Sequence, residues 1–149
     1  LLERAEAYAL SGQYDKAVND INAELSVFTK KKTQLTLDEI VDFYGSLAYY
    51  TPTKPTPKKA LNPLFTIERT TQEPLLQCIL QLRRLLTMHE GFRLQDVKRY
   101  GITMYRRQVD VQSNVTAVTD SMKTGDPRLA IQLPQDVISA GVTPNPRNK

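Results

Sequence analysis

Residues 75–86 read LLQCILQLRRLL, and this stretch decides the fold. Leu75, Ile79, Leu82 and Leu86 recur at spacings of four, three and four residues, which is typical of one face of an α-helix. Further leucines flank that face, so the stretch is more apolar than an ordinary surface helix. The sequence therefore predicts a central apolar helix, against which the other elements pack.

The two ends of this helix are also marked. Thr70 or Thr71 is placed to cap its N-terminus, and Pro74 is tolerated in a first helical turn. Arg83 and Arg84 are expected at the rim of the helix, where their charged ends reach water.

The first 31 residues predict a helical hairpin. Ala5 and Ala9 share one face of a first helix, and Gly12 interrupts the pattern. Asp15 is placed to cap a second helix. Small side chains on the first helix allow the second to approach closely, and glycine supplies the turn between them.

A third helix and a long loop follow. Thr36 and Glu39 form a capping box, so a helix is expected after Thr36. Four of the nine prolines then fall between residues 52 and 63. Because proline disrupts helices and central strands, we expect an extended surface loop there.

The remaining signals are weaker. Val109 and Val111 alternate with polar residues as in a short strand, and residues 113–114 are a candidate turn. Residues 129–133 alternate in the same way. Pro134 favours a short helix over residues 135–139, which Gly141 would end.

Composition argues against most enzyme classes. The 149 residues include 20 Lys+Arg and 16 Asp+Glu, a net charge of +4, with one cysteine and one histidine. Cys78 alone leaves no intramolecular disulfide and no cysteine-based zinc site, and His89 alone leaves triad chemistry short of partners. The basic excess is too weak for a nucleic-acid-binding surface. We expect no catalysis, no metal, no cofactor and no nucleic-acid partner.

The hairpin resembles a tetratricopeptide repeat. Residues 5–8 (AEAY) and 12–17 (GQYDKA) are similar to the end of that repeat's first helix and the start of its second. Stacked repeats need about three units to bury a continuous core. We therefore expect neighbouring repeats upstream, in a longer protein of which this chain is the C-terminal part.

The second half resembles the C-terminal part of the SusD/RagB family. Residues 79–91 are similar to the family's apolar helix with an Arg-Arg pair, and residues 96–101 (DVKRYG) to the segment that follows it. Residues 126–138 and the Asn-Pro at 145–146 are similar to the family's closing stretch.

This resemblance implies a nutrient-binding lipoprotein exposed on the outer membrane of Bacteroidota. Such a protein acts as a lid on a SusC-like TonB-dependent transporter and holds glycan fragments, or in some members peptides, for import. Its membrane contact would come only from a lipid anchor that this chain does not contain. The implied fold is mainly α: a tetratricopeptide-like hairpin packed with a SusD-like helical region, long loops and minor β segments. We divide it into residues 1–31, 32–69 and 70–149.

Aromatic residues are the candidate ligand contacts. A sugar needs an aromatic face and a few hydrogen-bonding groups, and the chain has no tryptophan. Tyr49 and Tyr50 adjoin the proline-rich loop, and Tyr105 stands beside two arginines, so these three are the predicted ligand-binding residues. The alternative is that the two loop tyrosines pack the loop onto the helices.

Glu90, Arg93 and Asp96 have two possible interpretations. Two carboxylates could act as the acid and base of a glycosidase. An arginine between them would lower the pKa of a carboxylate, and a catalytic acid needs the reverse, so an ion-pair network is expected. The main functional alternative is a helical-repeat scaffold that binds another protein.

Overall fold

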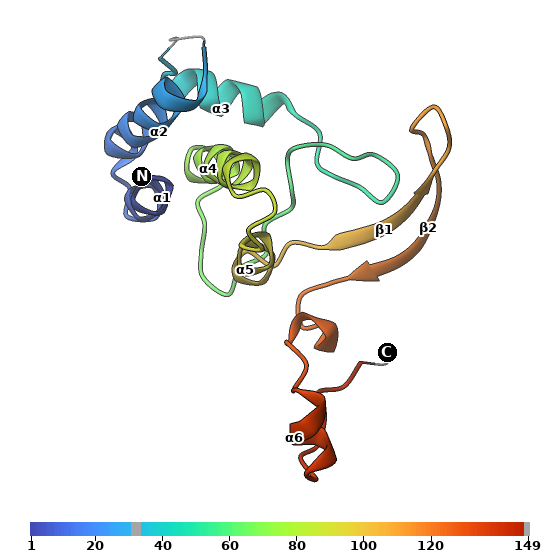
Figure 1. The fold of residues 1–149 in the computed structure, drawn as a ribbon. Helices are drawn as coiled ribbons and strands as arrows, with labels where there is room; N and C mark the ends of the chain where they lie inside the picture. Colours follow the sequence, from blue (N-terminus) through green and yellow to red (C-terminus); the bar gives the residue numbers. More distant parts are fainter. Residues whose placement is uncertain (31–33, 148–149) are drawn as a thin grey trace.

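The computed structural model describes residues 1–30 and 34–147 (Figure 1). Their architecture is mainly α with one small antiparallel sheet, which confirms the predicted fold class. The predicted boundary between residues 31 and 32 lies outside the described residues. The elements are α1 (Leu2–Leu10), α2 (Tyr14–Phe28), α3 (Leu37–Ser46), α4 (Gln72–Leu86), α5 (Arg93–Arg99), β1 (Met104–Val109), β2 (Val115–Met122), a 3₁₀ helix (Pro127–Leu129) and α6 (Gln135–Ser139).

Helix α4 lies at the centre of the helical part, as the sequence predicts. It packs against α1 on one side and α3 on the other (Figure 1). Leu75, Leu76 and Ile79 are fully buried. The apolar pattern overstates burial near the C-terminal end, because Leu82 is only partly buried and Leu85 is exposed. One core joins residues from all three expected divisions of the chain.

The N-terminal hairpin is confirmed. Gly12 takes a left-handed φ of 76° in the turn, and Ala5 and Ala9 are fully buried where α1 meets its neighbours. The predicted cap is wrong, because α2 has Gln13 at its N-cap and Asp15 in its first turn. A carboxylate in that turn still favours the positive end of the helix dipole.

Helix α3 begins at the predicted capping box. The backbone N–H of Glu39 donates to Thr36 Oγ1 at 3.2 Å, and the N–H of Thr36 donates to Glu39 Oε2 at 2.8 Å. Both halves of the box are therefore formed.

Thr71 stands at the N-cap of helix α4, as predicted, but its side chain makes no capping hydrogen bond. The carboxylate of Glu68 accepts hydrogen bonds from the backbone N–H groups of Thr71 at 2.7 Å and Gln72 at 3.0 Å, and also from Thr70. An acid four residues before the helix therefore satisfies the N–H groups that a helix start leaves unpaired.

Arg83 is buried, and its predicted place at the helix rim is wrong. Its guanidinium pairs with Glu6 of α1 and, at 2.6 Å, with Asp96 of α5. The Tyr100 hydroxyl also donates to Glu6. Burial opposes ionisation of Glu6, but the hydrogen bonds from Tyr100 and Arg83 outweigh it and lower its pKa.

The expected network of Glu90, Arg93 and Asp96 forms only in part. Arg93 Nη1 lies 3.4 Å from Asp96 Oδ2, and the Arg93 side chain is 30% exposed. Glu90 is exposed and takes part in none of the ion pairs found among the described residues. The chain bends out of the helix at His89 and Gly91, both with positive φ, which removes Glu90 from the helical face.

The C-terminal third contains a β-hairpin that the sequence predicted only roughly. β1 and β2 pair antiparallel with Met104 opposite Met122, so Val109 ends a strand and residues 110–114 form the turn. The strand expected around Val111 and the one expected over residues 129–133 are both absent from the described chain. The short helix after Pro134 is confirmed as α6.

The hairpin and α6 extend away from the helices, as Figure 1 shows. Neither strand and no part of α6 contains a buried residue. Over the described residues, no helix combines the length and apolar character needed to cross a membrane.

Candidate functional site

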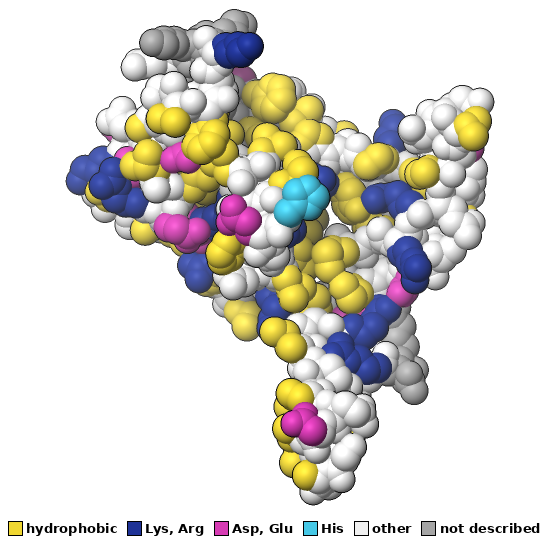
Figure 2. Space-filling view, viewed as in Figure 1, with side chains coloured by type: hydrophobic (Ala, Val, Ile, Leu, Met, Phe, Trp, Pro, Cys, Tyr) yellow, Lys and Arg dark blue, Asp and Glu magenta, His cyan; other side chains and the backbone are white. Residues whose placement is uncertain are grey.

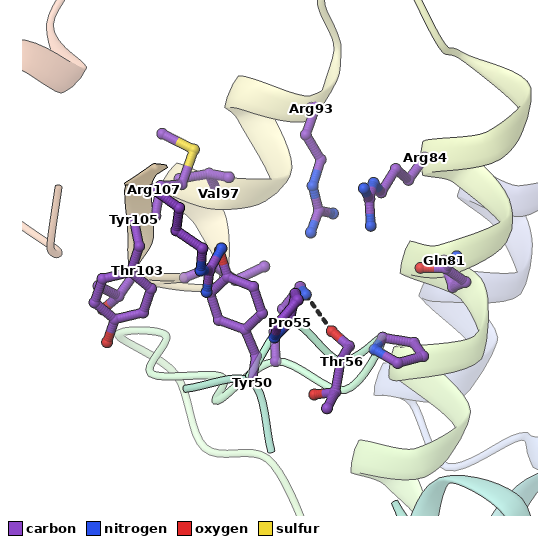
Figure 3. Close-up of a pocket in the computed structure, with 14 residues that line it drawn as sticks. Tyr50, Pro55, Thr56, Gln81, Arg84, Arg93, Val97, Thr103, Tyr105 and Arg107 are labelled. Atoms are coloured by element: carbon purple, nitrogen blue, oxygen red, sulfur yellow. Dashed lines mark hydrogen bonds between the residues drawn. The ribbon is translucent and has the colours of Figure 1, made fainter. Parts of the chain in front are cut away.

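A cavity of about 570 Å³ lies where the helices meet the hairpin. Its walls come from the proline-rich loop, α4, α5 and β1 (Figure 3). Figure 2 shows hydrophobic side chains gathered in the concave region between helices and hairpin, with Lys and Arg side chains near it. The lining residues are Tyr50, Pro55, Thr56, Pro57, Lys59, Gln81, Arg84, Arg93, Val97, Ile102, Thr103, Met104, Tyr105 and Arg107.

Tyr50 and Tyr105 stack on one wall of this cavity. Their ring centroids are 5.5 Å apart and the rings are inclined by 29°. Tyr50 is held by the loop backbone, where its N–H donates to the carbonyl of Lys58 at 2.7 Å. Tyr105 is held by β1, opposite Ser121 of β2. The structure thus brings together two of the three predicted ligand residues, one from the loop and one from the sheet.

Arg107 fastens the loop to β1. Its Nε donates to the carbonyl of Pro52 at 2.7 Å, its Nη2 donates to the carbonyl of Thr51 at 2.7 Å, and its Nη1 donates to the Tyr50 hydroxyl. Its Cζ lies 4.2 Å from the centre of the Tyr50 ring, a cation–π contact. The position of this guanidinium is therefore fixed by neutral groups.

Lys59 approaches the same tyrosine. Its Nζ lies 3.6 Å from the centre of the Tyr50 ring and donates to the carbonyl of Thr56 (Figure 3). Burial and, after it, the positive charges of Arg84, Arg93 and Arg107 together lower the pKa of Lys59 to about 8.

Two arginines from different helices face the cavity. Figure 3 shows the guanidinium groups of Arg84, from α4, and Arg93, from α5, extending toward the same space. Burial lowers the pKa of Arg93, and the charge of Arg84 adds to the decrease. The side chains around this space offer many N–H and O–H donors, while none of the residues lining the cavity is Asp or Glu.

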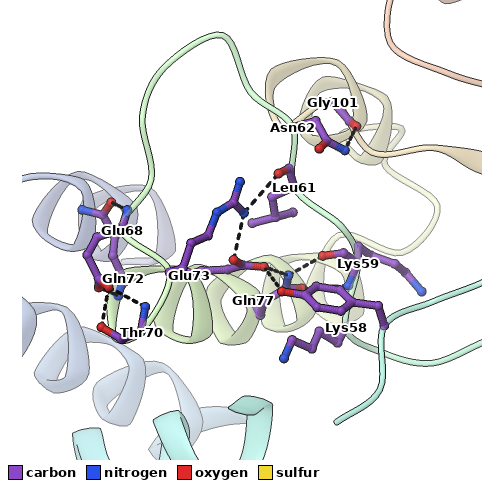
Figure 4. Close-up of polar contacts among 12 residues, drawn as sticks. Lys58, Lys59, Leu61, Asn62, Glu68, Thr70, Gln72, Glu73, Gln77 and Gly101 are labelled. Carbon is purple, nitrogen blue, oxygen red and sulfur yellow. Dashed lines mark hydrogen bonds and ion pairs between the residues drawn. The ribbon is translucent and has the colours of Figure 1, made fainter. Parts of the chain in front are cut away.

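Tyr49 lies apart from this cavity. Its hydroxyl donates to Glu73 Oε1 at 2.9 Å, and Lys58 Nζ lies 4.4 Å from the centre of its ring. Arg69 Nη1 donates to the other oxygen of Glu73 at 2.8 Å (Figure 4). Burial and the carboxylate of Glu73 raise the pKa of Tyr49. Its contacts join the loop to α4, which is the packing role weighed as the alternative.

Sequence reasoning missed the cationic part of the site. Arg107 enters the sequence analysis only as one of the two arginines beside Tyr105, and no lysine of the proline-rich loop is singled out there. Arg84 and Arg93 were assigned to a helix rim and an ion-pair network. The one local signal available was the adjacency of Tyr105 to arginine in a segment that alternates as a strand does.

The described residues offer little for metal or nucleophile chemistry. Among them, no group of three or more His, Cys, Asp or Glu is arranged to hold a metal ion. Cys78 is buried, and burial raises the pKa of its thiol to about 12, so the thiolate is scarce at neutral pH.

Fold and cavity together define a mainly α protein with a cationic, aromatic cavity at its helix–hairpin junction. No protein-family model matches the chain, and neither the curated proteins nor the solved structures include a match. The SusD/RagB resemblance and the residues assigned through it therefore stay predictions from the sequence.

Proposed function

We propose that this protein is a non-catalytic module that binds an oligosaccharide in the cavity between the proline-rich loop, α4, α5 and β1. The observation that carries the proposal is the stacked pair of Tyr50 and Tyr105 on the wall of a cavity rich in hydrogen-bond donors. Sugars are bound by aromatic rings that contact their apolar faces and by donors that reach their oxygens.

The two tyrosines have different parts in this proposal. Lys59 and Arg107 lie 3.6 and 4.2 Å from the centre of the Tyr50 ring, whereas Arg107 lies 5.4 Å from that of Tyr105, so the Tyr50 ring serves mainly to position the two cations. Tyr105 is the ring that contacts the sugar. Gln81 and Thr103 line the same cavity and supply neutral hydrogen-bonding groups.

The cellular role that we propose follows from the sequence resemblance. The module would be part of a surface lipoprotein of the outer membrane that passes glycans to a SusC-like TonB-dependent transporter. An oligopeptide ligand is the alternative within the same role, since backbone carbonyls and a terminal carboxylate also suit a donor-rich cavity.

Binding measured by isothermal titration calorimetry tests the proposal. An oligosaccharide identified on a glycan array is titrated into the wild-type chain and into the Tyr105→Ala variant. Loss of the ring is expected to weaken binding roughly five- to tenfold, because aromatic contacts contribute about 1 kcal/mol or more.

Tyr49→Phe is the matched control, because Tyr49 lies outside the cavity and the change removes only its hydroxyl. It should leave the affinity unchanged. Equal affinity of the Tyr105→Ala variant and the wild type would contradict the proposed site. Binding of peptides but of no saccharide would favour the oligopeptide alternative.

A further inference from the structure

The charges around the cavity are unbalanced. Lys59, Arg84, Arg93 and Arg107 line it, and no carboxylate does. Of these four, only Arg93 forms an ion pair among the described residues, with Asp96 at the long distance of 3.4 Å, and Asp96 is not one of the lining residues. Four positive groups in one cavity repel one another unless an anion joins them.

Several other arginines of the described chain have carboxylate partners. Arg4 pairs with Asp20 at 2.7 Å, and Arg69 pairs with Glu73 at 2.8 Å. Buried Arg83 pairs with three acids, Glu3, Glu6 and Asp96. In contrast, Lys59, Arg84 and Arg107 of the cavity form no ion pair with a carboxylate among the described residues.

Neutral contacts hold two of the four cations. Arg107 is fixed by the carbonyls of Thr51 and Pro52 and by the Tyr50 hydroxyl, and Lys59 by the carbonyl of Thr56. These contacts orient the charges without neutralising them. The lowered pKa of Lys59 agrees, because its causes after burial are the charges of the three arginines.

Arg84 and Arg93 are placed to receive an anion. They extend into the same space from α4 and α5 (Figure 3), and a guanidinium presents paired N–H groups that match carboxylate and sulfate oxygens. Val97, Ile102 and Met104 line the cavity beside them and supply apolar contact for the rest of a ligand.

We infer that the cavity selects an acidic oligosaccharide, whose carboxylate or sulfate group sits between Arg84 and Arg93 while its ring packs against Tyr105. This inference rests on the proposed saccharide-binding function and specifies its ligand class. Carboxylate and sulfate share the chemistry that two guanidinium groups recognise.

The test compares three probes of equal length by titration calorimetry: an oligogalacturonate, its fully methyl-esterified form and a sulfated galactan oligosaccharide. Esterification keeps the ring and removes the charge. The oligogalacturonate or the sulfated probe, or both, should bind at least roughly tenfold tighter than the ester, since charge-assisted hydrogen bonds are about twice as strong as neutral ones.

Two variants test whether an arginine of the cavity causes the preference for an acidic ligand. Arg84→Gln should abolish most of that preference, because Arg84 is an exposed residue whose change leaves the core intact. Arg106→Gln removes the same charge from an exposed position on β1 outside the cavity and should change affinity less than about twofold.

Each other outcome overturns a different claim. Equal binding of acid and ester, lost in Tyr105→Ala, would refute the acidic preference and leave the saccharide site standing. No binding of any probe would refute both proposals. An acidic preference that Arg106→Gln removes and Arg84→Gln keeps would refute the cavity as its source. An oligouridylate is titrated as a fourth, non-saccharide polyanion, and tighter binding of it than of every saccharide would refute the saccharide ligand class.

Discussion

Arg83 shows how one side chain links three helices. It belongs to α4, yet its guanidinium meets Glu6 of α1 and Asp96 of α5 below the surface. A charge buried in this way is tolerated only because these two buried acids, the exposed Glu3 at 3.3 Å and several hydrogen bonds offset its loss of water. A substitution that removes the Arg83 guanidinium therefore leaves the two buried acids without their partner, which lowers the free energy of unfolding.

Arg83→Met is expected to destabilise the fold by about 3 kcal/mol, because Glu6 and Asp96 lose their common partner inside the protein. Urea unfolding followed by circular dichroism measures the change. Arg93→Met is the control: its side chain is 30% exposed and its single carboxylate contact is 3.4 Å long, so its cost should stay below about 1 kcal/mol. Similar losses in both variants would show that Arg83 has no special role.

Periodicity identified apolar residues better than charged ones. Leu75 and Ile79 were predicted in the core and are fully buried. Arg83 was placed at the rim because periodicity treats every arginine as a surface residue. Its burial depends on Glu6, which lies 77 positions away in the sequence. A local sequence pattern cannot relate residues so far apart.

At the scale of elements, the sequence predicts a helix start best when the capping residues lie close together in the chain. The capping box of Thr36 and Glu39 formed as predicted because both of its partners lie within one turn. Helix α4 is capped instead by Glu68, whose carboxylate reaches three N–H groups across a turn of loop. Threonine was the expected residue type, and loop geometry decided otherwise.

Glu68→Ala should cost about 1 kcal/mol at neutral pH, as expected for a lost cap. Hydrogen bonds from Thr70 and from the backbone at the helix start lower the pKa of Glu68 to about 2, below its ordinary value of 4.5. Its contribution is therefore present above pH 4.5 and is lost as the pH falls toward 2.

Thermal melts at pH 7, 4 and 3 measure this dependence. The difference in midpoint between wild type and Glu68→Ala should narrow as the pH falls. Asp42→Ala, at an exposed position on α3, corrects for the general effect of losing a carboxylate. A difference that stays constant with pH would mean that the charge of Glu68 is not what caps the helix.

At the scale of the molecule, the candidate site is the part that sequence could least predict. Tyr50 and Arg107 are 57 positions apart, and Arg84 and Arg93 come from two further segments, α4 and α5. The fold class follows from local periodicity, whereas the site follows from how a proline-rich loop crosses between helices and hairpin. The candidate ligand residues follow from aromatic residue type. This criterion selects Tyr50 and Tyr105, which line the cavity, but also Tyr49, which lies outside it.

Stability should be uneven across this architecture. The buried residues of α4 lie at the centre of the core, while β1, β2 and α6 contain none. Backbone hydrogen bonds in segments with little burial open without unfolding the rest. Native-state hydrogen exchange, read by mass spectrometry, should show peptides from 75–80 exchanging at least roughly tenfold more slowly than those from 115–122, and 135–139 fastest.

An acidic oligosaccharide should slow hydrogen exchange in the hairpin and bring its rate closer to that of the core. It should not do so in α6. The cavity is lined by β1, the proline-rich loop, α4 and α5. A ligand that binds across it therefore stabilises the packing of β1 and the loop against these helices by mass action. Exchange over residues 104–109 should slow when an oligogalacturonate is added, and exchange over 135–139, outside the cavity, should not. Unchanged exchange over residues 104–109, or equal slowing over 135–139, would mean that the ligand does not bind across the cavity between β1 and the helices.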